Sequence, residues 1–129
     1  MLDKVKYIGN DTQSLAFSVD YVDYSVSCNK ILNLQAWVLK PGSATEPCDV
    51  RVILWNEETS IGYVLPTAVV QRQDVTKHFN HSVSYDYAGC AVNVPLTRTN
   101  LPKGTYEIVL SRWADDRYYD CRTQQRIEV

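Results

Sequence analysis

The chain has 129 residues, of which 45% are hydrophobic and 22% charged, and its formal net charge is -2. This length and composition predict a single globular domain over residues 1–129, and they exclude a disordered or collagen-like chain. Because the 13 lysine and arginine residues are scattered and no apolar stretch approaches the roughly 20 residues of a membrane-spanning helix, we expect neither nucleic-acid binding nor membrane insertion.

Alternation of apolar and polar side chains recurs along the chain, whereas helical periodicity is nearly absent. In residues 31–39, ILNLQAWVL, every second side chain belongs to an apolar face, and Trp37 lies on the opposite face. Similar patterns predict further strands at residues 4–8, 14–19, 49–55, 63–71, 90–94, 105–113 and 118–129. Seven to eight short strands without a repeat or a linker indicate an all-β, antiparallel, immunoglobulin-like β-sandwich.

Two connections between these strands are marked by proline and glycine. Residues 40–47, KPGSATEP, predict a long hairpin loop between the strands on either side. Residues 100–104, NLPKG, predict a turn before the strand at 105–113.

Residues 72–94, RQDVTKHFNHSVSYDYAGCAVNV, combine a charged pair, two histidines and a Gly-Cys step. Asp74 is placed to cap a single helical turn, in which Val75 and Phe79 are four residues apart and can both face the core. We expect this turn to carry the chain from one sheet to the other. Gly89 would then admit a bend or bulge where the next strand begins.

The polar residues of this stretch have structural explanations. Arg72 and Asp74, two residues apart at a strand end, are expected to form a salt bridge or a turn anchor rather than an acid-base pair. His78 and His81 supply only two of the ligands that a metal site needs, so no metal site is predicted. We therefore interpret residues 72–94 as part of the fold and not as a catalytic centre.

The cysteines are Cys28, Cys48, Cys90 and Cys121, and no two of them have the Cys-x-x-Cys spacing of a zinc site. Their even number is compatible with two disulfides in an oxidising compartment, for which three pairings are possible. Free thiols are the equal alternative.

Three motifs follow one another in the second half of the chain: Arg-x-Asp-Val-x-x-x-Phe, Tyr-x-x-x-Gly and Leu-x-x-Gly-x-Tyr-x-x-x-Leu. They consist of Arg72, Asp74, Val75, Phe79, Tyr85 or Tyr87, Gly89, Leu101, Gly104, Tyr106 and Leu110. In this succession they resemble small sandwich domains attached to bacterial cell-envelope glycan enzymes, including some glycosyltransferases and teichoic-acid-type polymerases. The resemblance covers roughly residues 31–112.

This resemblance implies a non-catalytic accessory module of the cell envelope or the cell surface. The similar domains usually have an aromatic residue after the glycine, where this chain has Cys90. The departure implies a disulfide between Cys90 and Cys121 on the last strand. A strand that often reads Gly-Trp-Ala in those domains is represented here by Ala36 and Trp37 in inverted order.

Catalytic signatures are absent from the sequence. It contains no Gly-x-Ser-x-Gly, no phosphate-binding glycine loop and no His-Glu-x-x-His, and two histidines leave little material for a nucleophilic triad. Adjacent carboxylates, as in Glu57-Glu58, are more typical of solvated loops than of a glycosidase site. We expect no enzymatic activity and no cofactor.

The best functional signal is aromatic. The chain has 9 Tyr and 3 Trp but only 2 Phe, and several of these rings lie beside charges in residues 113–120, WADDRYYD. Flat rings can stack on the C–H faces of a sugar, while neighbouring carboxylates and guanidinium groups bind its hydroxyls. The candidate ligand-binding residues are Trp113, Asp115, Asp116, Arg117, Tyr118 and Tyr119.

Three interpretations of these rings are open from the sequence: a glycan site, a protein-docking surface, or structural packing. A calcium site formed by Asp115, Asp116 and Asp120 is a further alternative. The predicted function is a non-catalytic accessory module that binds a glycan or positions a neighbouring catalytic domain. A protein–protein interaction domain, such as an adhesin or a secretion-partner module, is the alternative.

Overall fold

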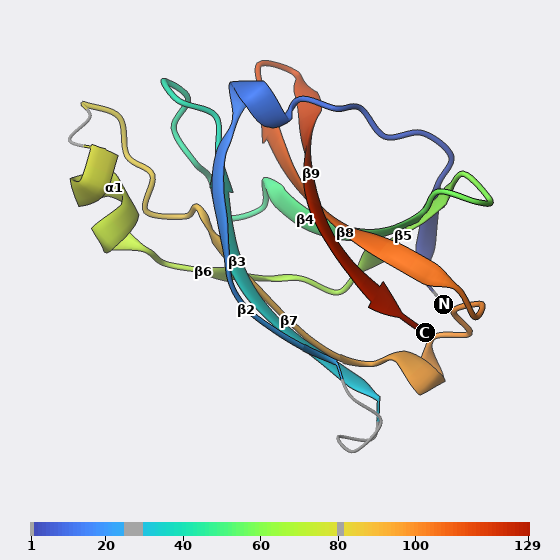
Figure 1. The fold of residues 1–129 in the computed structure, drawn as a ribbon. Helices are drawn as coiled ribbons and strands as arrows, with labels where there is room; N and C mark the ends of the chain where they lie inside the picture. The colour runs from blue at the N-terminus through green and yellow to red at the C-terminus, as the bar shows by residue number, and fades with distance from the viewer. Residues whose placement is uncertain (1, 25–29, 80–81) are drawn as a thin grey trace.

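The structure, a computed structural model, describes residues 2–24, 30–79 and 82–129 and consists mainly of two antiparallel β-sheets packed face to face (Figure 1). Sheet A has the strand order β1-β5-β4-β8-β9 and consists of β1 Asp3–Val5, β4 Val50–Asn56, β5 Ile61–Leu65, β8 Thr105–Ala114 and β9 Arg117–Glu128. Sheet B has the order β2-β3-β7-β6 and consists of β2 Ala16–Tyr24, β3 Ile31–Leu39, β6 Ala68–Val70 and β7 Gly89–Pro95. The predicted all-β sandwich is confirmed. Within these described ranges, the helical elements are α1 Gln73–Phe79 and the 3-10 turns Thr12–Ser14 and Leu96–Arg98.

The hydrophobic core lies between the sheets, because alternate side chains of each strand point inward. The inward residues of the two central strands are Leu32, Leu34, Ala36 and Val38 on β3 and Tyr106, Ile108 and Leu110 on β8. All of them are buried, and each fully buried Leu or Ile side chain contributes about 1.5–3 kcal/mol to the free energy of unfolding. The face that alternation predicts for residues 31–39 is therefore the core face.

Arg112 of β8 is the largest fully buried side chain, with 1% of its surface exposed. Its Nε donates to the carbonyl oxygen of Val38 at 3.2 Å, and its Nη2 donates to those of Tyr87 and Ala88 at 2.9 and 3.2 Å. A longer bond of 3.4 Å runs from Nη1 to the carbonyl oxygen of Glu46. Burial lowers the pKa of Arg112 to about 10, so the guanidinium remains charged at neutral pH. These bonds tie sheet A to the backbone of sheet B at one end of the sandwich.

The connection at residues 40–47 differs from the predicted hairpin loop. It joins β3 to β4, and these strands belong to different sheets. The chain crosses from sheet B to sheet A here, so the hairpin prediction is wrong. Turn-forming residues indicate that a strand ends, but they do not determine which strand the next one pairs with.

The predicted strand at residues 63–71 is two strands in two sheets. β5 ends at Leu65 and β6 begins at Ala68, and the chain changes sheet between them. Pro66 has no N–H to continue the ladder, and the hydroxyl of Thr67 accepts from the amide nitrogen of Val52 at 3.2 Å. The expected crossover after residue 72 is therefore wrong: α1 joins β6 to β7, which pair with each other in sheet B.

The predicted helical turn is present as α1, which packs on the outer face of one end of sheet B. Val75 is buried, and Phe79 is half-buried against the rings of Trp37 and Tyr85, with centroids 5.9 and 5.8 Å away. The helix begins at Gln73, so Asp74 lies inside its first turn and not at the position before it. Trp37, which alternation places on the outer face, is thus covered by this helix.

Arg72 connects α1 with the opposite edge of sheet B. Its Nε and Nη2 each donate to a carboxylate oxygen of Asp74 at 3.0 Å, and its Nη1 donates to Asp20 on β2 at 2.8 Å. Gly89 lies beside this cluster, and a Cβ there would be 2.5 Å from the carbonyl oxygen of Val70 and 2.7 Å from Cγ of Arg72. The reason for glycine is this close approach and not a bend.

The cysteines that the structure describes are free. Cys90 on β7 in sheet B and Cys121 on β9 in sheet A are both buried in the central core, where they pack as small apolar side chains. The implied Cys90–Cys121 disulfide is therefore wrong. Burial raises the pKa of both thiols to about 12, so they stay protonated and unreactive. Cys48 is exposed, and Cys28 lies outside the described residues.

Candidate functional site

The candidate residues 113–119 form the hairpin between β8 and β9. Asp115 and Asp116 make its two-residue turn, with φ angles of 51° and 65°. Two central residues with positive φ match the twist of a tight antiparallel hairpin, and aspartate tolerates this conformation better than most residues. The turn fixes the pairs Trp113 with Tyr118 and Ala114 with Arg117.

One side of this hairpin belongs to the outer face of sheet A. The rings of Trp113 and Tyr118 lie 5.0 Å apart at 79°, an edge-to-face contact. The guanidinium of Arg51 on β4 lies 3.6 Å from the Tyr118 centroid and stacks on that ring. Trp113 remains 41% exposed, so its indole is the ring on this side that a ligand could stack on.

The other side of the hairpin carries Arg117 and Tyr119, since strand residues alternate between faces. Arg117 lies 3.6 Å above the Tyr119 ring, with Lys40 at 5.4 Å, and Lys40 is ion-paired with Asp115 at 2.9 Å. The six candidate residues therefore do not share one surface: Trp113 is separated from Arg117 and Tyr119 by the strand pair itself.

The alternative of a calcium site finds no geometric support. The buried carboxylate of Asp120 accepts from the hydroxyl of Ser111 at 2.7 Å and from the amide nitrogen of Gly9 at 2.8 Å. Among residues 2–24, 30–79 and 82–129, no group of three His, Cys, Asp or Glu side chains is arranged to hold a metal ion. His81, one of the two histidines weighed above, lies outside these ranges.

A polar segment before β2 runs along the free edge of β9. The backbone of Asp11 donates to the carbonyl oxygen of Asp120 at 2.8 Å, and the Asp11 carboxylate accepts from the Asp120 amide nitrogen at 2.9 Å. The Thr12 hydroxyl accepts from the amide nitrogen of Arg122 at 2.9 Å. We call residues 8–14 the N-terminal strap; it covers part of an edge strand that would otherwise present unpaired backbone groups.

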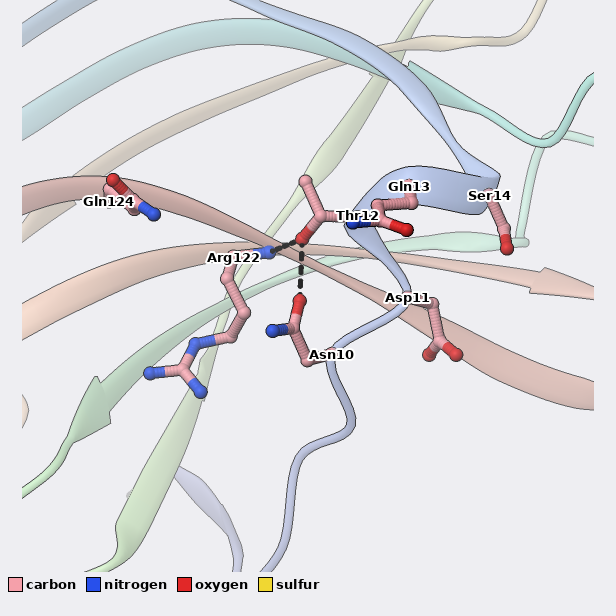
Figure 2. A pocket seen from close by; sticks show the side chains of 7 residues that line it. All are labelled: Asn10, Asp11, Thr12, Gln13, Ser14, Arg122 and Gln124. Atoms are coloured by element: carbon pink, nitrogen blue, oxygen red, sulfur yellow. Dashed lines mark hydrogen bonds between the residues drawn. The ribbon is translucent and has the colours of Figure 1, made fainter.

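A cleft of about 530 Å³ opens between the strap and β9 (Figure 2). Its lining residues are Asn10, Asp11, Thr12, Gln13, Ser14, Arg122 and Gln124. Figure 2 shows Thr12 in the middle, hydrogen-bonded to the Asn10 carboxamide and the Arg122 backbone, with Gln124 and Ser14 at opposite sides of the view. Carboxamides and hydroxyls make up most of the lining, and among the described residues no aromatic ring contributes to it.

Both charged residues of the cleft are already ion-paired. Asp11 binds Arg117 at 3.0 Å, and Arg122 binds Glu107 at 2.7 Å and Glu57 at 3.0 Å. Partial burial alone would raise the pKa of Asp11, but bonds from Arg117 and from the Asp120 amide outweigh it and hold the pKa below its usual value. The hydrogen bonds that Arg122 donates to the Glu107 carboxylate are the largest influence on its pKa, and they raise it.

Glu107 does not line the cleft, but it holds two residues that do, Arg122 and Gln124. Its side chain is buried, and its Oε1 accepts from Nε and Nη2 of Arg122 at 3.1 and 2.7 Å. Its Oε2 accepts from the amide nitrogen of Gln124 at 3.1 Å, where the β8–β9 register shifts and Gln124 has a φ of 63°. A non-glycine residue held at positive φ beside a cleft is a local strain of the kind that clusters at binding sites.

The remaining lining side chains are available for a ligand. Within the described part of the chain, the side chains of Gln13, Ser14 and Gln124 form no hydrogen bond, whereas Thr12 and Asn10 bond to each other at 2.9 Å. Sequence reasoning missed this cleft, because residues 10–14, NDTQS, have the composition of an ordinary polar loop. Only the tertiary fold places them beside β9.

Comparisons with known proteins identify no relative of this chain: no protein-family model, no curated protein and no solved structure matches it. No helix in the described residues is long and apolar enough to cross a membrane.

Proposed function

We propose that this chain is a non-catalytic binding module whose ligand is a glycan, and that the cleft between the N-terminal strap and β9 binds the hydroxyl groups of that glycan. The observation that carries the proposal is the lining of the cleft: neutral hydrogen-bonding side chains surround it, and its two charged residues, Asp11 and Arg122, already have ionic partners.

A sugar suits this lining for a chemical reason. Each sugar hydroxyl both donates and accepts hydrogen bonds, and so do the carboxamides of Gln13 and Gln124 and the hydroxyl of Ser14. An anionic ligand is less suitable, because Arg122 is shared between two carboxylates. The preferred ligand is therefore neutral and rich in hydroxyls.

The exposed ring of Trp113 offers a second contact for an extended glycan. Tyr118, its partner across the hairpin, and Arg122 are four residues apart on β9, or about 13 Å. A chain of several sugars could lie in the cleft and reach the indole. This retains Trp113 from the six predicted residues as the stacking surface.

We also propose that the sandwich is immunoglobulin-like. Support comes from the strand orders β2-β3-β7-β6 and β5-β4-β8-β9, which correspond to strands ABED and C′CFG of that fold, with β1 added at one edge. Tyr106 at the start of β8, the equivalent of strand F, is buried and donates its hydroxyl to the carbonyl oxygen of Pro102 at 2.6 Å. This is the arrangement of a tyrosine corner. The domain would serve as an accessory module in cell-envelope or surface-glycan biology, as the sequence resemblance implies.

A glycan array with matched variants tests the proposed function. The double variant Gln13→Ala/Gln124→Ala should bind its selected glycan about thirtyfold more weakly, since each of the two lost hydrogen bonds contributes about 1 kcal/mol. Gln125→Ala is the control, because this exposed carboxamide is adjacent to Gln124 but does not line the cleft. Equal affinity in the double variant, or no binding to any glycan by the parent protein, would contradict the proposal.

The second candidate function is protein docking at the edge of sheet B. β6 is a three-residue edge strand whose Val69 and Val70 are exposed, and a strand from another protein could pair with it. Val69→Lys should abolish binding of a protein partner while leaving glycan binding unchanged. Pull-down with the variant beside the parent protein separates this function from the first.

A further inference from the structure

The outer face of sheet B carries a tyrosine that the strand pattern alone would bury. In β2, Phe17 and Val19 pack against the core, and strict alternation would direct Tyr21 inward as well. The register with β3 shifts between Val19 and Tyr21, so Asp20 and Tyr21 are both exposed. Val22 then returns to the core side. This bulge leaves Tyr21 52% exposed on the outer face.

An ion pair fixes the bulge in place. Asp20, the extra residue, accepts from Nη1 of Arg72 at 2.8 Å, and Arg72 is itself held by both carboxylate oxygens of Asp74. The pair joins β2, one edge of sheet B, to the segment that leads into α1 at the other edge. Bulges held in this way often serve to aim a side chain. Here the side chain aimed into solvent is Tyr21.

The polar side chains that line the groove beside Tyr21 are carboxamides, and the carboxylate of Asp23 lies at its margin, in the row next to Tyr21. The register places Gln35 of β3 beside Tyr21 and Ala91 of β7 beside Gln35, and in the next row Asn33 pairs with Asn93. A shallow groove of about 190 Å³ runs among these residues. The small Ala91 leaves room between the taller side chains, and no lysine or arginine of the described ranges lines the groove.

We infer that this groove is a second glycan-binding surface, which takes a neutral glycan lying across the strands of sheet B. An exposed tyrosine ring can stack on the C–H face of a sugar, and three carboxamides around it can exchange hydrogen bonds with the hydroxyls. The inference shares its ligand class with the proposed function, but it concerns a different sheet and does not require the strap cleft to bind.

Two sites on opposite sheets would give the domain two ways to hold one polysaccharide or to bridge two. A second contact within the same polymer is intramolecular, so it increases the apparent affinity for long chains without tighter binding at either site. Short oligosaccharides should therefore occupy each site separately, and polymers should bind more tightly than the two sites do alone.

The experiment is an NMR titration of the isotope-labelled chain with four neutral probes: cello-, malto-, manno- and N-acetylchito-oligosaccharides. We expect saturable shifts at Tyr21, Gln35 and Asn93 with at least one probe, and at least a fivefold loss of that affinity in Tyr21→Ala. Tyr7→Ala is the control, because Tyr7 is 80% exposed but does not line the groove. Gln35→Ala, another exposed position, repeats the test if Tyr21→Ala folds poorly.

The outcomes separate this inference from the proposed function. Saturable shifts confined to Gln13 and Gln124 would overturn the inference and leave the cleft proposal standing. Shifts confined to Tyr21 and its neighbours would overturn the cleft proposal and leave this inference standing. Concentration-dependent shifts at Tyr21 without any sugar would identify the groove as a contact between two copies of this chain, and no shifts with any of the four probes would overturn both.

Discussion

The outer faces of the two sheets differ in what covers them. On sheet A the outer residues Ile53, Trp55 and Val109 are apolar, and Ile8 of the N-terminal strap packs over them as a second buried cluster. On sheet B the middle of the outer face carries Gln35 and other carboxamides, and α1 covers only the end at Trp37.

The difference follows from the free energy of exposing each kind of side chain. Apolar outer residues are stabilised by a cover, and the chain supplies one from its own N-terminal strap. Carboxamides remain hydrated without a cover, so the face of sheet B can stay open. The candidate ligand-binding groups lie next to these covers: beside the N-terminal strap on sheet A, and beyond the end of sheet B that α1 covers.

The largest expected effect is on stability, when a covered residue on sheet A and an open residue on sheet B are each replaced by alanine. Ile53→Ala on the covered face should lower the free energy of unfolding by about 2–4 kcal/mol, because it leaves a cavity beneath the strap. Gln35→Ala on the open face should change it by less than about 0.5 kcal/mol. Chemical denaturation of both variants measures the difference, and similar losses would mean that the two faces are not distinct.

A smaller effect is expected from loosening the strap. Asp120→Asn weakens the bonds from the Gly9 amide and the Ser111 hydroxyl, and it should lower the free energy of unfolding by about 1–3 kcal/mol. In this variant, hydrogen exchange at the amides of Gly9 and Asp11 should accelerate more than exchange at the centre of β4. Unchanged protection at these amides would show that the strap is held without Asp120.

The pH dependence of stability tests the ion pair at the cleft. The folded state lowers the pKa of Asp11, so this carboxylate stabilises the fold above its unfolded pKa of about 4 and loses that contribution as pH falls through its lower folded pKa. Stability should decrease between about pH 5 and pH 2. Asp11→Asn should make this decrease shallower, and so should Arg117→Gln. Denaturation at several pH values gives the free energy of unfolding of each variant. If it falls with pH as steeply in the variants as in the parent protein, the Asp11–Arg117 pair is not the cause.

The smallest effect is expected at Trp113, the exposed ring beyond the strap. Trp113→Ala should change the free energy of unfolding by less than about 1 kcal/mol but weaken glycan binding about two- to tenfold, the loss of one stacked ring. Trp113→Phe should restore part of the affinity. If Trp113→Ala retains full affinity, the glycan lies in the cleft without reaching this ring.

The strands and their core faces could be predicted from the sequence, because period-two alternation is a local property. Residues 31–39 and 105–113 lie within one residue of the observed β3 and β8. The predicted strand at residues 63–71 was wrong, since its two halves enter different sheets. Alternation identifies the inward face of a strand, but it is the same pattern in both sheets and does not indicate which sheet the strand joins.

The candidate site was harder to predict from the sequence than the strands. Trp113 and Tyr118 do come together, as a short hairpin between alternating strands suggests, but Arg117 and Tyr119 lie on its other side. The strap cleft depends on hydrogen bonds between residues 9–12 and 120–122, more than a hundred positions apart. No local sequence pattern predicts a contact between such distant segments.

The sequence by itself determined an all-β chain with a helical turn after β6, since backbone geometry and neighbouring side chains decide these features. The tertiary structure alone decided which sheet each strand joins, that Cys90 and Cys121 remain free thiols, and that Arg112 is satisfied by backbone carbonyls. It also decided that the bulge turns Tyr21 outward. These outcomes depend on contacts between distant segments, whose energies exist only once both sheets are assembled.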